Sequence, residues 1–325
     1  MHVFYLHLPW RIDEEEYNCS SRPLSEWQNR GSYNYAQGIY FSMAGTIFIV
    51  LYVLCLVGMY RGHLLRIPCY RLMLINGFAD IADLVLTSYV TAYFHFTGGI
   101  FCSSKNFEWI AGHLAYSLWF GASFNCMVLA FNRLVEMVPA ARSLGFFFEG
   151  KVLYMWTSLS IFYMIIVWFV LRPIPFNTVI SAFIGPPMIG DPEWEHQHYT
   201  SAYLLFYNLI VTLVMLTVYP YLCWYVRKVS VAHGNVDKAQ MQIFTQVLCV
   251  CVTTAIAALL YASIELLPSV PRVVIIAAHV LWHLSHGMHG VTYMCFNPRI
   301  RREVFALFKT FKTVPYTVSS TNQGF

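Results

Sequence analysis

Seven long apolar stretches constrain this chain of 325 residues more than any other feature of its sequence. A helix rises about 1.5 Å per residue, so roughly 20 mainly apolar residues cross a hydrocarbon core of about 30 Å. Strands that span a membrane alternate in polarity, and a run such as 47–57 does not. We therefore expect transmembrane helices over residues 38–60, 72–96, 109–136, 152–171, 201–226, 241–266 and 273–296.

The composition agrees with a chain that is solvated mainly by lipid. Hydrophobic residues make up 58% and charged residues 11% of the sequence, whereas soluble domains carry about 25% charged residues. The apolar start, residues 1–10, is short and lacks a cleavage site of small residues, so we expect the first span to insert itself. The fold class expected is all-α, a seven-transmembrane helix bundle embedded in the lipid bilayer, and nothing in the sequence indicates binding to nucleic acid.

The distribution of basic residues predicts the orientation. Most of the 20 lysines and arginines follow the first, third and fifth spans or lie in the C-terminal segment. The other three loops hold one each: Lys105, Arg172 and Arg272. Because short cytoplasmic loops are enriched in Lys and Arg, we expect residues 1–37 outside the cell, 38–296 in the membrane and 297–325 in the cytoplasm.

Two features of the expected outer segments fit this orientation. Asn18-Cys19-Ser20 is an N-glycosylation acceptor pattern, so Asn18 is a candidate for glycosylation. Of nine cysteines, only Cys19 and Cys102 fall in outer segments, where oxidation is possible. We hypothesise a disulfide between them.

Residues 299–312 have the pattern of a helix that lies on the inner leaflet. Apolar positions fall on one side and basic positions on another, and anionic lipid attracts such a helix. The apolar side holds Ile300, Val304, Leu307, Phe308 and Phe311, and the basic side holds Arg302, Lys309 and Lys312.

Short motifs at the ends of spans resemble those of rhodopsin-like G-protein-coupled receptors. Asn132-Arg133-Leu134 resembles the Asp-Arg-Tyr motif, and Asp83 lies where that superfamily has an intramembrane aspartate. Residues 289–293 with Asn297 resemble the end of its seventh span. The resemblance implies an activation switch formed by Asp83, Asn132, Arg133, Tyr293 and Asn297.

More specifically, the whole chain resembles a nematode serpentine receptor of class T. The features that carry this resemblance are Tyr17 to Ser20 with Trp27, Tyr70 to Met73, and Asn132 to Glu136. It implies a chemosensory receptor that binds an extracellular small-molecule or peptide ligand and activates a heterotrimeric G-protein. The expected location is the plasma membrane, with the ciliary membrane of sensory neurons as one expectation from the family.

The chain also departs from the superfamily pattern. Gly45-Thr46 replaces a Gly-Asn pair, span 241–266 has no proline, and loop 172–200 has no cysteine. These departures weigh against the superfamily's sodium pocket and its usual outer disulfide. Span 273–296 has no lysine, which excludes a retinal Schiff base there.

Ionisable residues inside the bilayer are functional candidates, because an unpaired charge there costs several kcal/mol. Asp80 and Asp83 share one helix face, which suits either a conformational or proton-linked switch or a hydrogen-bonded interior carboxyl. Arg133 suits either an activation switch or a basic side chain that reaches the membrane surface. His279, His283, His286 and His289 share a face, so they form either a ligand-facing stripe or interhelical hydrogen bonds.

Aromatic and ionisable residues in the outer halves of the spans are candidates to line a ligand pocket. Most aromatics in a membrane bundle only pack or lie at the interface, so the ligand class stays open. The candidate ligand-binding residues are His113, Tyr116, Phe120, Tyr203, Tyr207, Tyr261, Glu265, His279, Trp282 and His283.

Two other functions compete with a receptor. In a seven-helix zinc hydrolase, His279 and His283 would bind the metal together with an aspartate from span 72–96. In a channel or transporter, we would expect internal repeats and more intramembrane charges, and neither is visible. We favour the receptor, and we expect no catalytic residue, metal or cofactor.

Overall fold

The computed structural model describes residues 4–233, 238–267 and 269–312, without the side chains of 230–233, 238–240 and 309–312. The expected tail 313–325 and the side chains of Lys309, Phe311 and Lys312 therefore lie outside the described residues.

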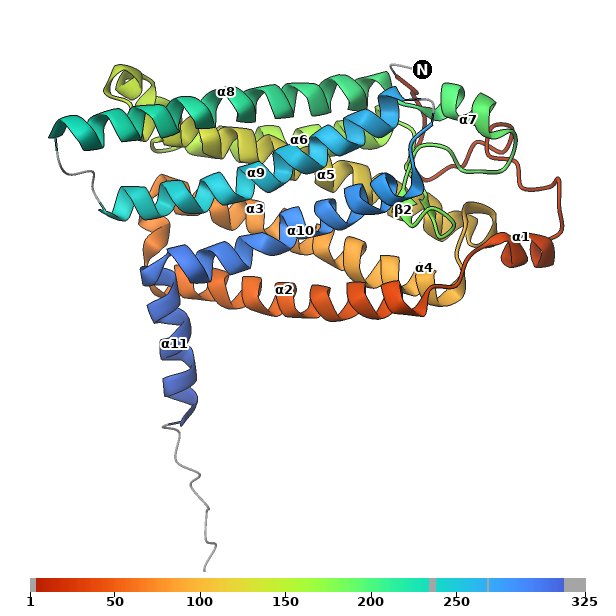
Figure 1. The fold of residues 1–325 in the computed structure, drawn as a ribbon, viewed down its shortest axis with the longest axis horizontal. Coiled ribbons are helices and arrows are strands. Elements are labelled where there is room, and N and C mark those ends of the chain that lie inside the picture. Colours follow the sequence, from red (N-terminus) through yellow and green to blue (C-terminus); the bar gives the residue numbers. More distant parts are fainter. Residues whose placement is uncertain (1–3, 234–237, 268, 313–325) are drawn as a thin grey trace, which may run out of the picture.

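Long helices run side by side along the longest axis of the molecule (Figure 1). They are α2 (Tyr35–Arg61), α3 (Pro68–Val85), α4 (Thr91–Thr97), α5 (Lys105–Met137), α6 (Val152–Val170), α8 (Ala202–His233), α9 (Lys238–Leu266) and α10 (Arg272–Phe296), with the π-helical turn η2 (Leu86–Val90) joining α3 to α4. Apart from α8, which continues to His233, these helices begin and end within about one turn of the ranges expected from hydropathy.

Shorter elements connect these helices. They are α1 (Leu24–Arg30), η1 (Leu64–Arg66), η3 (Phe101–Ser103), η4 (Pro139–Phe148), β1 (Phe176–Asn177), β2 (Ala182–Phe183), α7 (Pro192–Tyr199) and α11 (Pro298–Lys312). The two strands pair antiparallel, with Phe176 opposite Phe183.

Six helices in the described part of the chain are long and apolar enough to cross a membrane: Tyr35–Arg61, Pro68–Thr97, Lys105–Met137, Val152–Val170, Ala202–Val229 and Met241–Leu266. The 25-residue helix α10 is not among these six, and its buried face carries four histidines. It packs against α9 and α2 and runs beside the other long helices (Figure 1). The predicted all-α membrane bundle is therefore confirmed, and the two-residue strands are its one small exception among the described residues.

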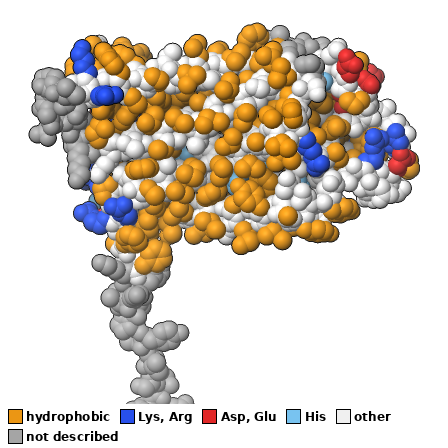
Figure 2. Space-filling view, viewed as in Figure 1, with side chains coloured by type: hydrophobic (Ala, Val, Ile, Leu, Met, Phe, Trp, Pro, Cys, Tyr) orange, Lys and Arg blue, Asp and Glu red, His pale blue; other side chains and the backbone are white. Residues whose placement is uncertain are grey.

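The side of the bundle is apolar and its ends are polar. Figure 2 shows hydrophobic side chains covering the length of the helices, with the acidic side chains at the end that carries α1 and α7. Large apolar residues such as Leu213 and Leu216 of α8 are more than half exposed, which suits contact with lipid tails.

The second span contains a π-helical turn, η2, at its closest approach to α2. A π turn accommodates an extra residue and shifts the helix face beyond it, and such turns are frequent at functional sites. Gly45 permits this contact, because a Cβ on Gly45 would lie 2.0 Å from Ser88 Oγ. Helix α2 and the second span therefore pack more closely than two side chains would allow.

A second small core holds the outer segments against the bundle. Tyr17, Trp27, Phe101, Trp109 and Tyr199 pack together, next to the disulfide between Cys19 and Cys102, the pair hypothesised from the sequence, with a Cα–Cα distance of 5.6 Å. Burial raises the pKa of Tyr17. The outer end of the bundle therefore carries an ordered cap.

The residues before this cap form an extended segment along α5 and α6. Tyr5 N donates to Val170 O (2.8 Å), and Trp109 Nε1 donates to Pro9 O (2.7 Å). Arg172 Nη2 donates to Glu16 Oε1 at 2.9 Å. Hydrogen bonds to the backbone thus fix the first described residues over the ends of two helices.

Helix α11 leaves the bundle at a steep angle after α10 (Figure 1). Asn297 Oδ1 accepts a hydrogen bond from Ile300 N at 3.2 Å and so caps the new helix. Ile300 and Val304 are buried against α2, and Phe305 and Phe308 are more than half exposed. The exposed phenylalanines face away from the bundle, as a helix that also contacts a membrane surface would require.

Candidate functional site

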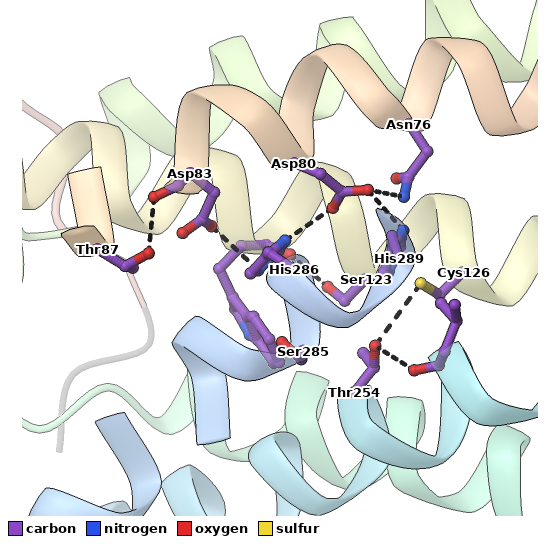
Figure 3. A network of polar contacts seen from close by, with 12 residues as sticks. Asn76, Asp80, Asp83, Thr87, Ser123, Cys126, Thr254, Ser285, His286 and His289 are labelled. Carbon is purple, nitrogen blue, oxygen red and sulfur yellow. Dashed lines mark hydrogen bonds and ion pairs between the residues drawn. The ribbon is translucent and has the colours of Figure 1, made fainter. Parts of the chain in front are cut away.

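A buried polar network joins α3 to α10 near the middle of the bundle (Figure 3). Asp80, which is fully buried, is its centre. Tyr52 Oη and Asn76 Nδ2 each donate to Asp80 Oδ2 at 2.6 Å. His286 Nδ1 lies 2.7 Å from Oδ1, and His289 Nδ1 lies 2.8 Å from Oδ2. One carboxylate therefore binds four side chains from three helices.

Asp83 lies one turn further along α3 and has fewer partners. Its Oδ2 atom is 3.2 Å from His286 Nε2 and 3.3 Å from Trp282 Nε1. Its Oδ1 atom is buried without a hydrogen-bond partner. The sequence favoured Asp83 over Asp80 as the switch residue, but the structure gives Asp80 the larger set of contacts.

Trp282 connects this network to a void among α5, α8, α9 and α10. Its indole N–H faces Asp83 and His286, and its side chain lines the void. The void has a volume of about 10 Å³, which is room for about one water molecule. Its lining consists of Tyr116, Trp119, Ile174, Leu204, Asn208, Tyr261 and Trp282.

Two polar groups on the lining of this void lack partners. Trp119 Nε1 donates to Asn208 Oδ1 at 3.0 Å, which fixes the orientation of the amide. Asn208 Nδ2 is then a donor without an acceptor, and Tyr261 Oη has no hydrogen-bond partner either. A buried polar group without a partner costs about 1–3 kcal/mol. Both groups can donate a hydrogen bond to an acceptor placed in the void, which as it stands has room for about one water-sized molecule.

The β1–β2 hairpin packs against Trp282, one of the residues that line the void. The ring centroid of Phe183 lies 5.8 Å from those of His279 and Trp282. Glu108, fully buried on α5, accepts a hydrogen bond from Phe176 N at 2.7 Å. Contacts to two helices therefore hold the hairpin in place.

A larger cavity of about 370 Å³ opens beyond the hairpin. Its lining comes from the end of α1, the loop before α7, α7 itself and the segment from the end of α9 to the start of α10, and includes Arg30, Glu195, His196 and Glu265. Burial raises the pKa of Glu195 and lowers that of His196. Glu195 accepts hydrogen bonds from the backbone N–H groups of residues 188–190, so its role is to shape this loop.

The structure divides the candidate ligand residues among several places. Tyr116, Tyr261 and Trp282 line the void, and Glu265 lines the outer cavity. Glu265 Oε2 also accepts a hydrogen bond from Ser201 N at 2.9 Å. These four residues lie between the outer surface and the buried network.

Three further candidates form an aromatic cluster between α5, α6 and α8. Phe120 and Tyr207 have ring centroids 4.4 Å apart, and Tyr207 Oη donates to Phe120 O at 3.0 Å. Tyr203 Oη lies 2.8 Å from Tyr163 Oη. The phenol groups are paired with one another or with the backbone, and none of the three predicted residues lines the void.

The remaining histidine candidates also lie away from the void. His113 pairs with His7, with the two Nε2 atoms 3.1 Å apart. His283 Nδ1 lies 3.3 Å from Thr87 Oγ1. His279 packs against Phe41 and the hairpin, and its Nδ1 atom has no hydrogen-bond partner.

The candidate switch residues at the inner end are buried. Arg133, which is 1% exposed, donates from Nη2 to Asn132 Oδ1 at 2.6 Å. Asn297 Nδ2 donates to Tyr70 Oη (2.6 Å) and Gln246 Oε1 (3.2 Å), which joins α3 and α9 to the start of α11. Tyr293 packs edge-on against Tyr52, which reaches Asp80. A chain of contacts therefore runs from the buried network to the inner end.

Sequence reasoning missed several residues of this arrangement. Asn76 and Asp80 are four residues apart, a spacing that signals a helix-face pair and was available in the sequence. Tyr52, Trp119 and Asn208 come from three different helices, so no local pattern relates them. Their roles depend on how the helices pack.

The zinc-hydrolase alternative is not supported by this geometry. Asp80 and Asp83 contact His286 and His289, not the proposed ligands His279 and His283. Within the described part of the chain, no three His, Cys, Asp or Glu side chains are arranged to hold a metal ion.

Comparison with known proteins agrees with the helix bundle. Residues 2–316 match the family described as serpentine type 7TM GPCR chemoreceptor Srt. The chain is also 26% identical over 297 residues to serpentine receptor class T-55 of Caenorhabditis elegans. The aligned region covers 90% of this chain and 80% of that protein. The chain therefore belongs to the Srt family of serpentine seven-transmembrane chemoreceptors.

Proposed function

We propose that the protein binds an extracellular ligand between α5, α8, α9 and α10 and activates a heterotrimeric G-protein at its inner end. The observation that carries this proposal is the position of Trp282. One edge of its side chain lines the void, and its N–H lies 3.3 Å from Asp83 and 3.1 Å from His286. A ligand in the void would therefore contact a side chain of the buried network directly.

The orientation that goes with this function places residues 1–37 outside the cell and 297–325 in the cytoplasm. The distribution of Lys and Arg supports it, and so does the disulfide, which would lie on the oxidising side. Asn18 is exposed and available for glycosylation. We place the receptor in the plasma membrane, with the ciliary membrane of sensory neurons as the family-based expectation.

The chemistry of the void suggests the kind of ligand. Its lining is mainly aromatic and aliphatic, and its two polar groups without partners are Asn208 Nδ2 and Tyr261 Oη. Asn208 Nδ2 can only donate, and a phenol can donate or accept. A small neutral molecule with a carbonyl or ether oxygen satisfies both, after entering from the outer cavity and displacing the side chains that close the void.

Activation requires two arrangements of the bundle that the ligand distinguishes. A ligand shifts such an equilibrium only by its difference in affinity for the two states. The inner end has the parts for a second arrangement, since Arg133 is buried with Asn132, and Asn297 ties α3 and α9 together. Separation of these contacts would present Arg133 to a G-protein, as in related receptors.

Nucleotide exchange on a panel of co-expressed G-proteins tests the proposal. Wild type and Arg133→Ala are compared against a library of small neutral carbonyl compounds, together with Arg142→Ala, an exposed basic residue near the same end, as the matched control. We expect exchange in wild type and the control, and at least a tenfold loss in Arg133→Ala at equal surface expression. Equal exchange in both variants would contradict the role of Arg133.

A further inference from the structure

The contacts of His286 suggest that the bundle contains a binding site for one proton. We infer that Asp80, Asp83 and His286 hold that proton as an imidazolium ion between two carboxylates, and that this ion clamps α3 to α10. The inference goes beyond the proposed receptor function, because neither a ligand nor a G-protein is needed for the site to exist or to be tested.

Both nitrogens of the His286 ring face a carboxylate. Nδ1 lies 2.7 Å from Asp80 Oδ1, and Nε2 lies 3.2 Å from Asp83 Oδ2. A neutral imidazole carries one N–H and an imidazolium carries two, so only the charged form presents an N–H to both carboxylates at once. Hydrogen bonds between two charged groups are also stronger than those between neutral groups.

His289 differs from His286 in this respect. Its Nδ1 atom lies 2.8 Å from Asp80 Oδ2 and 3.0 Å from Tyr52 Oη, which places both partners on the same ring nitrogen. A neutral ring with its hydrogen on Nδ1 satisfies these contacts. The second proton therefore belongs to His286.

Trp282 gives the site a second hydrogen-bond pattern. Its Nε1 atom lies 3.1 Å from His286 Nε2 and 3.3 Å from Asp83 Oδ2, so three polar atoms form a nearly equilateral triangle. When His286 is charged, its Nε2–H forms an ion pair with Asp83 Oδ2, and the indole N–H donates to the same oxygen. When His286 is neutral, its Nε2 accepts the indole N–H, and Asp83 loses both the ion pair and the indole donor. The two patterns differ by one proton.

Loss of that proton is unfavourable in the closed bundle. The other titratable groups that face the cluster are Tyr52 from α2, Cys126 from α5, Tyr261 from α9, and His283, His289 and Tyr293 from α10. These include no Lys or Arg, so a neutral His286 leaves two buried carboxylates without a compensating cation. Because uncompensated charge in the membrane interior is costly, deprotonation favours separation of α3 from α10.

Nuclear magnetic resonance of the full chain in lipid nanodiscs tests this inference directly. With ¹⁵N-labelled histidine, the signals of His286 are assigned as those lost in His286→Gln. We expect both ring nitrogens to carry hydrogen at about pH 8, where an ordinary histidine with a pKa near 6.5 is almost entirely neutral. A His286 ring with one bare nitrogen at that pH would overturn the inference.

A charge-compensation experiment tests the clamp. We expect His286→Gln to lower the thermal midpoint by about 10 °C, because it removes the cation that lies between two buried carboxylates. Adding Asp83→Asn to His286→Gln removes one of those charges and should restore at least half of the loss. His283→Gln, one turn away and facing no carboxylate, is the matched control and should change the midpoint by only about 2 °C.

The outcome separates charge from packing. If His286 only filled space, the losses from His286→Gln and Asp83→Asn would add, and that result would overturn the clamp. Should His286→Gln fail to fold, the resonance measurement on wild type still decides the protonation state, with assignment by selective loss in the double variant. Failure of either experiment leaves the proposed signalling role to be judged by its own nucleotide-exchange assay.

Discussion

The α3–α10 network and the void next to it contain similar residue types but differ in how completely their polar groups are hydrogen-bonded. Around Asp80, Tyr52 and Asn76 donate to the carboxylate and two histidines form ion pairs with it, so both oxygens of Asp80 have partners, although Asn76 Oδ1 and Asp83 Oδ1 beside it do not. Around the void, Asn208 Nδ2 and Tyr261 Oη lack hydrogen-bond partners. Satisfied buried polar groups make a core rigid, and unsatisfied ones are available to a ligand. The comparison assigns the first region to structural coupling and the second to recognition.

The largest expected effect comes from the centre of the satisfied region. Asp80→Asn should lower the free energy of unfolding by about 3–5 kcal/mol, because His286 and His289 lose the charge they bind. Asp83→Asn should cost less, since Asp83 contacts only His286 and Trp282. Thermal unfolding in nanodiscs measures both, and an equal or larger loss in Asp83→Asn would contradict the assignment of Asp80 as the centre.

A backbone contact beside the network should have the next largest effect. Gly45→Ala should lower the free energy of unfolding by about 1–3 kcal/mol, because the new Cβ would lie 2.0 Å from Ser88 Oγ and push η2 away from α2. Gly145→Ala is the control, since its Cβ would meet only Glu149 Oε1 at 3.8 Å. The two thermal midpoints, measured side by side, test whether close approach at η2 matters.

Two asparagines compare the regions directly. Asn76→Leu removes a donor to the Asp80 carboxylate, together with an Oδ1 atom that has no hydrogen-bond partner. Because the lost bond is to a charged group, the net cost should be about 1–2 kcal/mol. Asn208→Leu removes a bare Nδ2 but also the acceptor of Trp119 Nε1, so its net cost should be within about 1 kcal/mol.

In a ligand-binding assay, the two asparagine variants should show the opposite order, with the larger effect in Asn208→Leu. Asn208→Leu should weaken a carbonyl ligand about tenfold, the value of one lost hydrogen bond near 1.4 kcal/mol. Asn76→Leu, which does not line the void, should leave ligand binding to the folded fraction unchanged. A larger loss of stability in Asn208→Leu than in Asn76→Leu would break the contrast between the regions.

A histidine at the outer end should give the smallest effect, with the opposite sign of that expected at His286. Burial lowers the pKa of His7 below its ordinary value of 6.5. The unfolded segment then takes up a proton below about pH 6.5 while the docked segment does not, so docking weakens as the pH falls. In wild type, the protection of residues 4–10 from hydrogen exchange, measured relative to an unstructured peptide at the same pH, should therefore decrease between about pH 7 and pH 5.

The control for this effect removes the titrating ring. His7→Gln should show the same exchange rate at both pH values, apart from the intrinsic pH dependence of exchange, for which an unstructured peptide corrects. A pH response that persists in His7→Gln would assign the titration to another outer group, such as His196, whose pKa burial also lowers.

The elements that sequence reasoning placed well are those set by local pattern. The apolar spans, the disulfide partners and the start of α11 follow from hydropathy, compartment and the Asn297-Pro298 boundary. The histidine stripe was also predictable, because residues three or four apart lie on the same face of a helix. The sequence did not show that the stripe has two halves with different partners. His286 and His289 contact Asp80, whereas His279 packs against the hairpin and His283 contacts Thr87 of η2.

The ligand candidates show the same limit. Tyr116, Tyr261 and Trp282 line the void. Phe120, Tyr203 and Tyr207 lie instead in a separate aromatic cluster, where the rings of Phe120 and Tyr207 pack together and the Tyr207 phenol donates to Phe120 O. All six are aromatic residues in the outer halves of spans, so composition and depth do not separate them. The direction of each side chain depends on the rotation of its helix, which neighbouring helices decide.

The sequence by itself determined that this chain enters a membrane as helices, because backbone polar groups in lipid must be satisfied within each segment, and only long apolar runs allow this. It also indicated that Asp80, Asp83 and the histidines of span 273–296 would lie inside the bilayer, although the buried Glu108 was not among the predicted residues. The tertiary structure decided how those groups pair, since Asp80 meets histidines more than 200 residues later in the chain. Such pairing depends on the rotation and depth of two helices, and distances of 2.7–3.3 Å between their side chains are set only when the whole bundle packs.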